Sequence, residues 1–199
     1  MSTKSITCAL LTALSLAAAG CGVSEQGRAP AVVRIDALDA AAGAATLGTF
    51  GGSLHSDVAT NTGGAFTDVG RVTLSLVLRD PGSPGVANTP SELNSVTITH
   101  YRVVYRRTDG RNVEGVDVPF AFDSGMTITV SATGQGQQTF DLVRISAKFE
   151  APLRALASNN QGIDTIADVT FYGKDMHNND VAVTGSIGVT FANFGDSTS

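Results

Sequence analysis

The side chains that could act as a nucleophile and its base occur together at one place, where Ser53, His55 and Asp57 follow one another closely. A serine attacks a carbonyl only when a rigidly held histidine accepts its proton. Here the three residues lie in the stretch 51–70, whose Gly, Thr, Ser and Asn content predicts a long surface loop. No G-x-S-x-G elbow accompanies them. The pattern therefore indicates polar loop residues, and no catalytic residue is assigned.

A metal site is the second chemistry to consider. His55, His100 and His177 lie on different predicted elements, without the spacing of an H-E-x-x-H site. The segment 175–180, DMHNND, carries oxygen donors of the kind that Ca²⁺ prefers, but it lacks the spacing of an EF-hand loop. Asp and Asn are also the residues that tight turns select, so we expect a turn and no metal or other cofactor. The calcium candidates, kept as an alternative, are Asp175, Asn178 and Asp180.

Paired carboxylates could support glycoside hydrolysis, which needs two carboxyl groups at a fixed separation within a cleft. Strands of unknown register do not supply that separation, so we expect no enzyme activity. The carboxylates considered are Asp141, Glu150, Asp164 and Asp168.

Four arginines gather around one predicted hairpin and could bind an anionic lipid head group or polysaccharide. Exposed strand edges often carry such charges, which discourage aggregation. The solvated edge is the favoured interpretation for Arg102, Arg106, Arg107 and Arg111.

The first 21 residues carry a different kind of chemistry. Lys4 precedes an uncharged apolar run, 6–19, which ends in Ala18 and Ala19 and is followed by Gly20 and Cys21. These are the parts of a secretory signal peptide. The run is also short for a membrane span, which takes roughly 20 apolar residues.

The residues directly before Cys21 resemble the lipobox of bacterial lipoproteins, although the usual leucine is replaced by Ala18. The resemblance implies cleavage before Cys21, a diacylglyceryl group on its sulfur and an acyl chain on its new amino terminus. Two or more chains anchor a protein stably, so the membrane becomes the first partner. Gly22 does not indicate inner-membrane retention, which favours the outer membrane of the cell envelope, with the domain in the periplasm or on the surface. The alternative is an ordinary signal peptide with a cysteine near the cut by chance.

Composition sets further bounds. Residues 21–199 suffice for one domain, and neither Cys8 nor the acylated Cys21 would leave it a free thiol. The formal net charge of −5, or −6 without Lys4, and the absence of a basic stripe argue against nucleic acid. We predict a signal peptide over 1–20, a flexible tether over 21–30, one domain over 31–195 and a polar tail over 196–199.

Alternating apolar residues predict the strands. Tyr101, Val103 and Tyr105 are expected to face inward, and a shift in the pattern between Leu142 and Val143 predicts a β-bulge. Short helical turns are expected within 37–45 and 151–160, and a loop over 80–90. The predicted strands are 31–35, 71–79, 95–107, 113–122, 126–130, 140–149, 167–172 and 181–192.

Seven to eight short strands with frequent turns predict an all-β, antiparallel β-sandwich. The last two strands resemble those of bacterial immunoglobulin-like domains. The stretches YRVVYRRTDGRNVEGVDVPF and ADVTFYGKDMHNNDVAVTGSIGVTFANFGD also resemble an uncharacterised family of secreted bacterial lipoproteins. That resemblance covers most of residues 70–195 and implies fold and location, with no activity.

The expected function is a lipid-anchored binding or structural module without catalysis, active in protein interaction or adhesion. The loops 51–70 and 80–90, or a sheet edge, are the expected contact surfaces. The alternative is a small-ligand or glycan-binding lipoprotein, which predicts a concave aromatic patch formed by Tyr101, Tyr105 or Tyr172.

Overall fold

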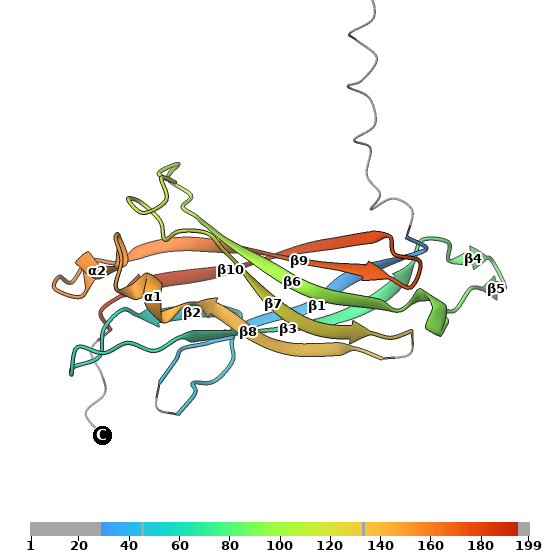
Figure 1. Cartoon of the computed structure of the whole chain (residues 1–199), viewed down its shortest axis with the longest axis horizontal. Helices are drawn as coiled ribbons and strands as arrows, with labels where there is room; N and C mark the ends of the chain where they lie inside the picture. Colours follow the sequence, from blue (N-terminus) through green and yellow to red (C-terminus); the bar gives the residue numbers. More distant parts are fainter. Residues whose placement is uncertain (1–28, 45, 133, 195–199) are drawn as a thin grey trace, which may run out of the picture.

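The structure, a computed structural model, describes residues 29–44, 46–132 and 134–194 (Figure 1). The predicted signal peptide, Cys21, most of the tether and the polar tail lie outside the described residues. The described chain forms two packed β-sheets and a separate two-stranded sheet, which confirms the predicted all-β sandwich.

The first sheet has the order β1-β3-β8, comprising β1 (Ala31–Ala41), β3 (Asp68–Leu78) and β8 (Gly136–Val143). The second has the order β2-β10-β9-β6-β7. Its strands are β2 (Ser53–Asp57), β10 (Asp180–Ala192), β9 (Ile163–Asp175), β6 (Val96–Arg106) and β7 (Phe122–Val130). The short elements are β4 (Gly82–Ser83), β5 (Val86–Ala87), the 3₁₀ turn η2 (Glu92–Asn94), α1 (Ile145–Lys148) and α2 (Leu153–Leu156).

This strand order is that of an immunoglobulin-like domain. The central pair of the second sheet, β6 and β9, is antiparallel, and the last strand β10 extends it. An early strand, β2, then pairs in parallel with β10, while β1 and β3 pair in the opposite sheet. The eight main strands thus match the expected fold class, with β7 added beside β6 as in variable-type domains.

A cluster of aromatic rings packs between the two sheets. Tyr101 of β6 contacts Phe140 of β8 and Phe171 of β9, with ring centroids 5.0 and 6.3 Å away. Phe122 of β7 packs edge-on to Tyr101 at 6.2 Å. The described residues contain no cysteine, so packing alone holds the two sheets together.

Both buried tyrosines of β6 reach across the sandwich to the backbone of β8. The Tyr101 hydroxyl accepts the Asp141 N–H and donates to the Asp141 carbonyl, both at 3.1 Å. The Tyr105 hydroxyl donates to the Leu142 carbonyl at 2.5 Å. Leu142 is the extra residue of a β-bulge, since the register jumps from Asp141 to Val143 opposite β3. The predicted bulge is confirmed. The Tyr101 and Tyr105 hydroxyl groups form hydrogen bonds with backbone groups of Asp141 and Leu142 at this bulge.

A second bulge lies in β6 at Thr99, between the paired residues Ile98 and His100. It makes two consecutive residues, Thr99 and His100, face solvent before Tyr101 turns inward again. Gly173 of β9 lies opposite this bulge, and a Cβ there would be 2.2 Å from the Thr97 carbonyl oxygen.

Three local predictions are wrong. No helical turn forms over 37–41, because these residues are the second half of β1 and pair with β3 as far as Ala41. The loop 51–70 contains β2 and the start of β3. Residues 113–121, predicted to be a strand, instead form a series of turns with a single β-bridge between Glu114 and Val118.

The strand 140–149 ends early at Val143, because α1 follows and turns the chain toward α2. The predicted turn within 151–160 is confirmed as α2, where Leu153 and Leu156 are buried. The expected inward side chains of β6 and the C-terminal hairpin are also confirmed.

Candidate functional site

Ser53, His55 and Asp57 lie on β2, where alternate residues share one face. Asp57 and His55 both contact Phe194. The Asp57 carboxylate accepts the Phe194 N–H at 3.1 Å. The His55 ring packs edge-on to the Phe194 ring, with centroids 5.4 Å apart. Asp57 and His55 therefore hold the residues after β10 against the edge strand instead of forming part of a catalytic triad.

The four carboxylates do not converge. Asp164 and Asp168 share the outer face of β9 four residues apart, about 13 Å at the usual strand rise. That exceeds the roughly 6.5–9.5 Å of inverting glycosidases. Asp164 accepts the Thr190 hydroxyl, and Asp141 and Glu150 lie on other elements.

The DMHNND segment is a tight turn between β9 and β10. The Asp175 carboxylate accepts the N–H groups of His177 and Asn179 and the Asn179 side-chain amide, at 2.8–2.9 Å. Burial alone would raise the pKa of Asp175, but these hydrogen bonds outweigh it and lower the pKa. Asn178 takes a positive φ of 64° and Asp180 pairs with Lys174. Asp175 and Asn178 therefore serve the turn, and Asp180 forms an ion pair beside it.

His100 lies on β6, His55 on β2 and His177 in the β9–β10 turn. Throughout the described ranges, no group of three or more His, Cys, Asp or Glu side chains is placed to hold a metal ion.

Each of the four arginines forms an ion pair with an aspartate of its own domain. On the outer face of the second sheet, Arg102 pairs with Asp123 and Arg106 with Asp168. Burial opposes ionisation of Asp168, yet hydrogen bonds from Arg106 and Ser186 lower its pKa. The other pairs, Arg107 with Asp109 and Arg111 with Asp117, lie in the β6–β7 connection.

A buried polar cluster that the sequence does not reveal lies where β3 begins. The Lys148 ammonium contacts the Asp68 carboxylate at 2.9 Å, and both side chains are only 1% exposed. Asp68 also accepts the Ser56 hydroxyl at 2.6 Å and the Gly43 N–H at 2.8 Å. Because Ser56 is fully buried, its hydroxyl is not open to a substrate. The cluster joins β2, β3 and α1 and is structural.

The β6–β7 connection, residues 107–121, is an internally bonded loop. Asp117 accepts the Arg111 guanidinium and the Val113 N–H, and Gly115 donates its N–H to the Val118 carbonyl. Val118 is fully buried beneath. Gly115 has a φ of 73°, and the Phe120 ring occupies the space that a side chain there would need. The loop therefore has a fixed shape.

Three apolar side chains project from this loop into solvent. The exposed fractions are 60% for Val113, 65% for Val116 and 51% for Phe120. We call these three residues the loop tip. An ordered loop that leaves three large apolar groups in water is the strongest candidate contact surface on the domain.

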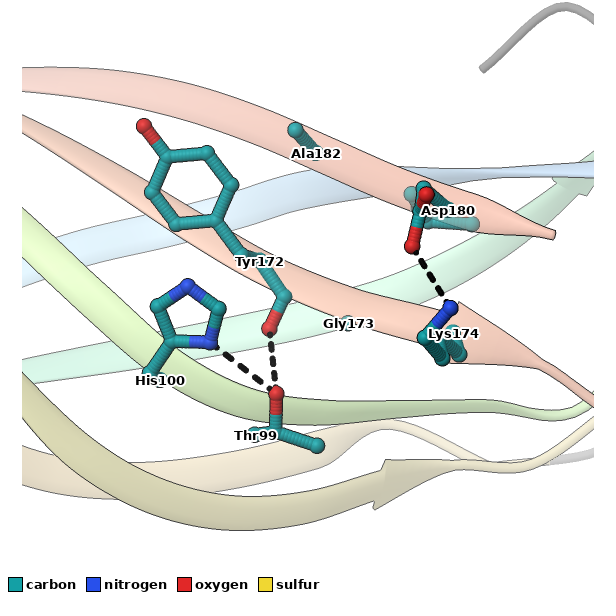
Figure 2. Close-up of a pocket in the computed structure, with 8 residues that line it drawn as sticks. Thr99, His100, Tyr172, Gly173, Lys174, Asp180 and Ala182 are labelled. Carbon is teal, nitrogen blue, oxygen red and sulfur yellow. Dashed lines mark hydrogen bonds and ion pairs between the residues drawn. The ribbon is translucent and has the colours of Figure 1, made fainter. Parts of the chain in front are cut away.

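The outer face of the second sheet carries a shallow hollow of about 140 Å³, lined by residues of β6, β9 and β10 (Figure 2). The His100 and Tyr172 rings stack beside it, with centroids 4.9 Å apart and planes at 11°. The Thr99 hydroxyl contacts His100 Nδ1 at 3.0 Å. Tyr101 and Tyr105 are 2% and 3% exposed, so Tyr172 is the one of the three candidate tyrosines that lines this hollow.

Comparisons of the chain with protein families, with curated proteins and with solved structures give no match. In the part of the chain that the structure describes, no helix is long and apolar enough to cross a membrane.

Proposed function

We propose that this chain is a lipid-anchored, non-catalytic interaction module of the bacterial cell envelope, which binds another envelope protein through the loop tip. Cys21 is the proposed lipid attachment site and the outer membrane the proposed location. The observation that carries the proposal is the exposure of Val113, Val116 and Phe120 on an ordered loop.

The energetics of binding support this choice. Association costs free energy when loops must be ordered on contact, and a preformed loop avoids that cost. Protein interfaces also draw most of their affinity from a few apolar and aromatic anchors near their centre. The loop tip offers such anchors in a fixed arrangement, and ion pairs of Arg107 and Arg111 lie in the same loop.

The position of the loop supports the proposal as well. The described chain starts at Ala29, at the end of the sandwich where β1 begins (Figure 1). The connection 107–121 leaves β6 at the opposite end (Figure 1). An anchor at Cys21 would hold the first end near the membrane and leave the loop tip free for a partner.

The anchor is tested by comparing the natural chain with Cys21→Ala in bacteria. We expect the natural chain in the membrane fraction with an added diacylglyceryl and acyl mass, and the variant released without it. Protease treatment of intact cells then separates a surface from a periplasmic domain. Equal location and mass for both chains would refute the anchor.

The interaction is tested with a photo-crosslinking residue at position 116 in living cells. A matched probe at Thr127, exposed on the neighbouring strand β7, controls for random collisions. We expect one discrete protein adduct from position 116 only, lost when Val113→Ser and Phe120→Ser are added. An adduct that survives these changes, or equal labelling at both positions, would contradict binding through the loop tip.

Small-ligand or glycan binding is the second candidate, favoured by the stacked His100 and Tyr172 rings beside the hollow. Flat sugar faces pack on aromatic rings, and Lys174 with Asp180 would supply polar contacts at the rim. Titration with soluble envelope glycans should then perturb the Tyr172 ring resonances, and Tyr172→Ala should abolish binding. No perturbation by any glycan would dismiss this candidate.

A further inference from the structure

The end of the sandwich where the described chain begins carries its own exposed apolar side chains. Val86 is 73% exposed on β5, Leu93 66% on η2 and Met176 64% in the β9–β10 turn. We call these three residues the anchor-end trio. With Val113 and Val116 of the loop tip, they are the five most exposed large hydrophobic residues described. The most exposed large apolar side chains therefore lie at two opposite ends of the domain.

The register shows why the trio shares one end. Val96 pairs with Asp175, so Leu93, just before β6, lies near Met176, just after β9. Val86 belongs to the same β3–β6 connection as Leu93. Figure 1 shows β4, β5 and the β9–β10 turn together at the right-hand end.

The chain also enters the fold at this end. Arg79 donates its backbone N–H to the Pro30 carbonyl at 3.1 Å and its guanidinium to the Ala29 carbonyl at 2.8 Å. Ala29 itself is 1% exposed, so the entry point is fixed. Only residues 22–28 separate it from Cys21, and seven residues extend at most about 25 Å.

We propose that the anchor-end trio inserts into the lipid surface to which Cys21 is attached, so that the sandwich stands upright on the membrane. This inference rests on the proposed lipid anchor. A tether of seven residues keeps the domain at high effective concentration near the lipid, so three side chains suffice to set its orientation. The loop tip then points away from the membrane.

The charges at this end define the lipid surface that fits. Asp80, Glu92 and Asp175 lie in the same connections. The two cations described at this end already have partners, because the Arg79 guanidinium donates to the Ala29 carbonyl and Lys174 pairs with Asp180. The end is therefore not basic, and anionic head groups would gain nothing from it. Insertion depends on apolar contact, so it should occur on zwitterionic phosphatidylcholine and change little with salt.

The test uses the full lipidated chain in phosphatidylcholine vesicles that contain a lipid-borne fluorescence quencher. The mature chain has no other thiol, so a single cysteine can carry a fluorophore at either end. Ser83→Cys reports on the anchor end, because Ser83 pairs with Val86, and Glu114→Cys reports on the opposite loop. The key variant adds Val86→Ser, Leu93→Ser and Met176→Ser to the Ser83→Cys chain.

We expect at least fivefold stronger quenching at position 83 than at position 114, and its loss in the triple-serine variant. Equal quenching at both positions, or no change in the variant, would overturn the inference. Mass and co-flotation with vesicles are measured on the same samples. A chain that is acylated and floats but shows no selective quenching refutes only the insertion, whereas a chain without acyl groups refutes the anchor. Circular dichroism of the variant confirms that it is folded.

Discussion

Replacing Lys148 by methionine tests whether the buried polar cluster stabilises the domain. Methionine keeps most of the side-chain volume but removes the ammonium group. The Asp68 carboxylate would then remain 1% exposed, with only the Ser56 hydroxyl and the Gly43 N–H as donors. Breaking a buried pair in this way costs about 3–5 kcal/mol, because it leaves one charge without its partner.

The expected loss is large enough to measure by thermal unfolding. In a domain of this size, 1 kcal/mol corresponds to about 2–4 °C in Tm. Lys148→Met should therefore lower Tm by about 6–20 °C. The double variant Asp68→Asn with Lys148→Met should recover much of this loss, since no charge then remains buried.

The matched control is Lys174→Met, which breaks an exposed pair with Asp180 whose side chains are 49% and 51% exposed. Exposed pairs contribute about 0–1 kcal/mol, so Tm should change by no more than about 4 °C. If Lys148→Met changed Tm as little as the control, or if the double variant were less stable than the single one, the reasoning on the cluster would be refuted.

Three further predictions concern the backbone of the sandwich. Tyr105→Phe should lower the free energy of unfolding in urea by about 1–3 kcal/mol, because it leaves the carbonyl of the β8 bulge without its buried donor. Gly173→Ala should destabilise by about 1–3 kcal/mol through the clash with β6, whereas Gly188→Ala, with nothing within 4 Å of its Cβ, should be neutral; equal effects would contradict this. The lowered pKa of Asp175 means that its contribution is complete above the unfolded value of about 3.9 and is lost as pH falls through the folded pKa. The protection of the β9–β10 turn amides, measured against the intrinsic exchange rate at each pH, should therefore fall in acid, and Asp175→Asn should abolish that pH dependence of protection.

The sequence predicts those elements whose signal is local. In β10 the residues from Val181 to Phe191 alternate between the two faces of the sheet. The predicted strand 181–192 agrees with the observed strand Asp180–Ala192. The phase shift at Leu142 predicted the bulge because an extra residue reverses the alternation.

Elements that depend on distant partners were missed. β2 has a serine, Ser56, at an inward position, and only the carboxylate of Asp68 makes its burial favourable. Lys148 lies within the predicted strand 140–149, and its burial could not be predicted because it requires the same partner. The loop tip could not be predicted either, because Val113, Val116 and Phe120 fall within the predicted strand 113–122, which is instead a series of turns.

The last strand, β10, contacts the first two strands of the fold. β10 pairs with β2, and its Gly185 packs against Ile35 and Leu38 of β1. During synthesis, these early strands therefore emerge long before the strand that covers them. Contacts so distant along the chain form slowly, and unpaired strands are prone to aggregate meanwhile. The domain completes its fold only after the residues of β10 have been synthesised. A chaperone that binds the unfinished chain would therefore reduce its aggregation.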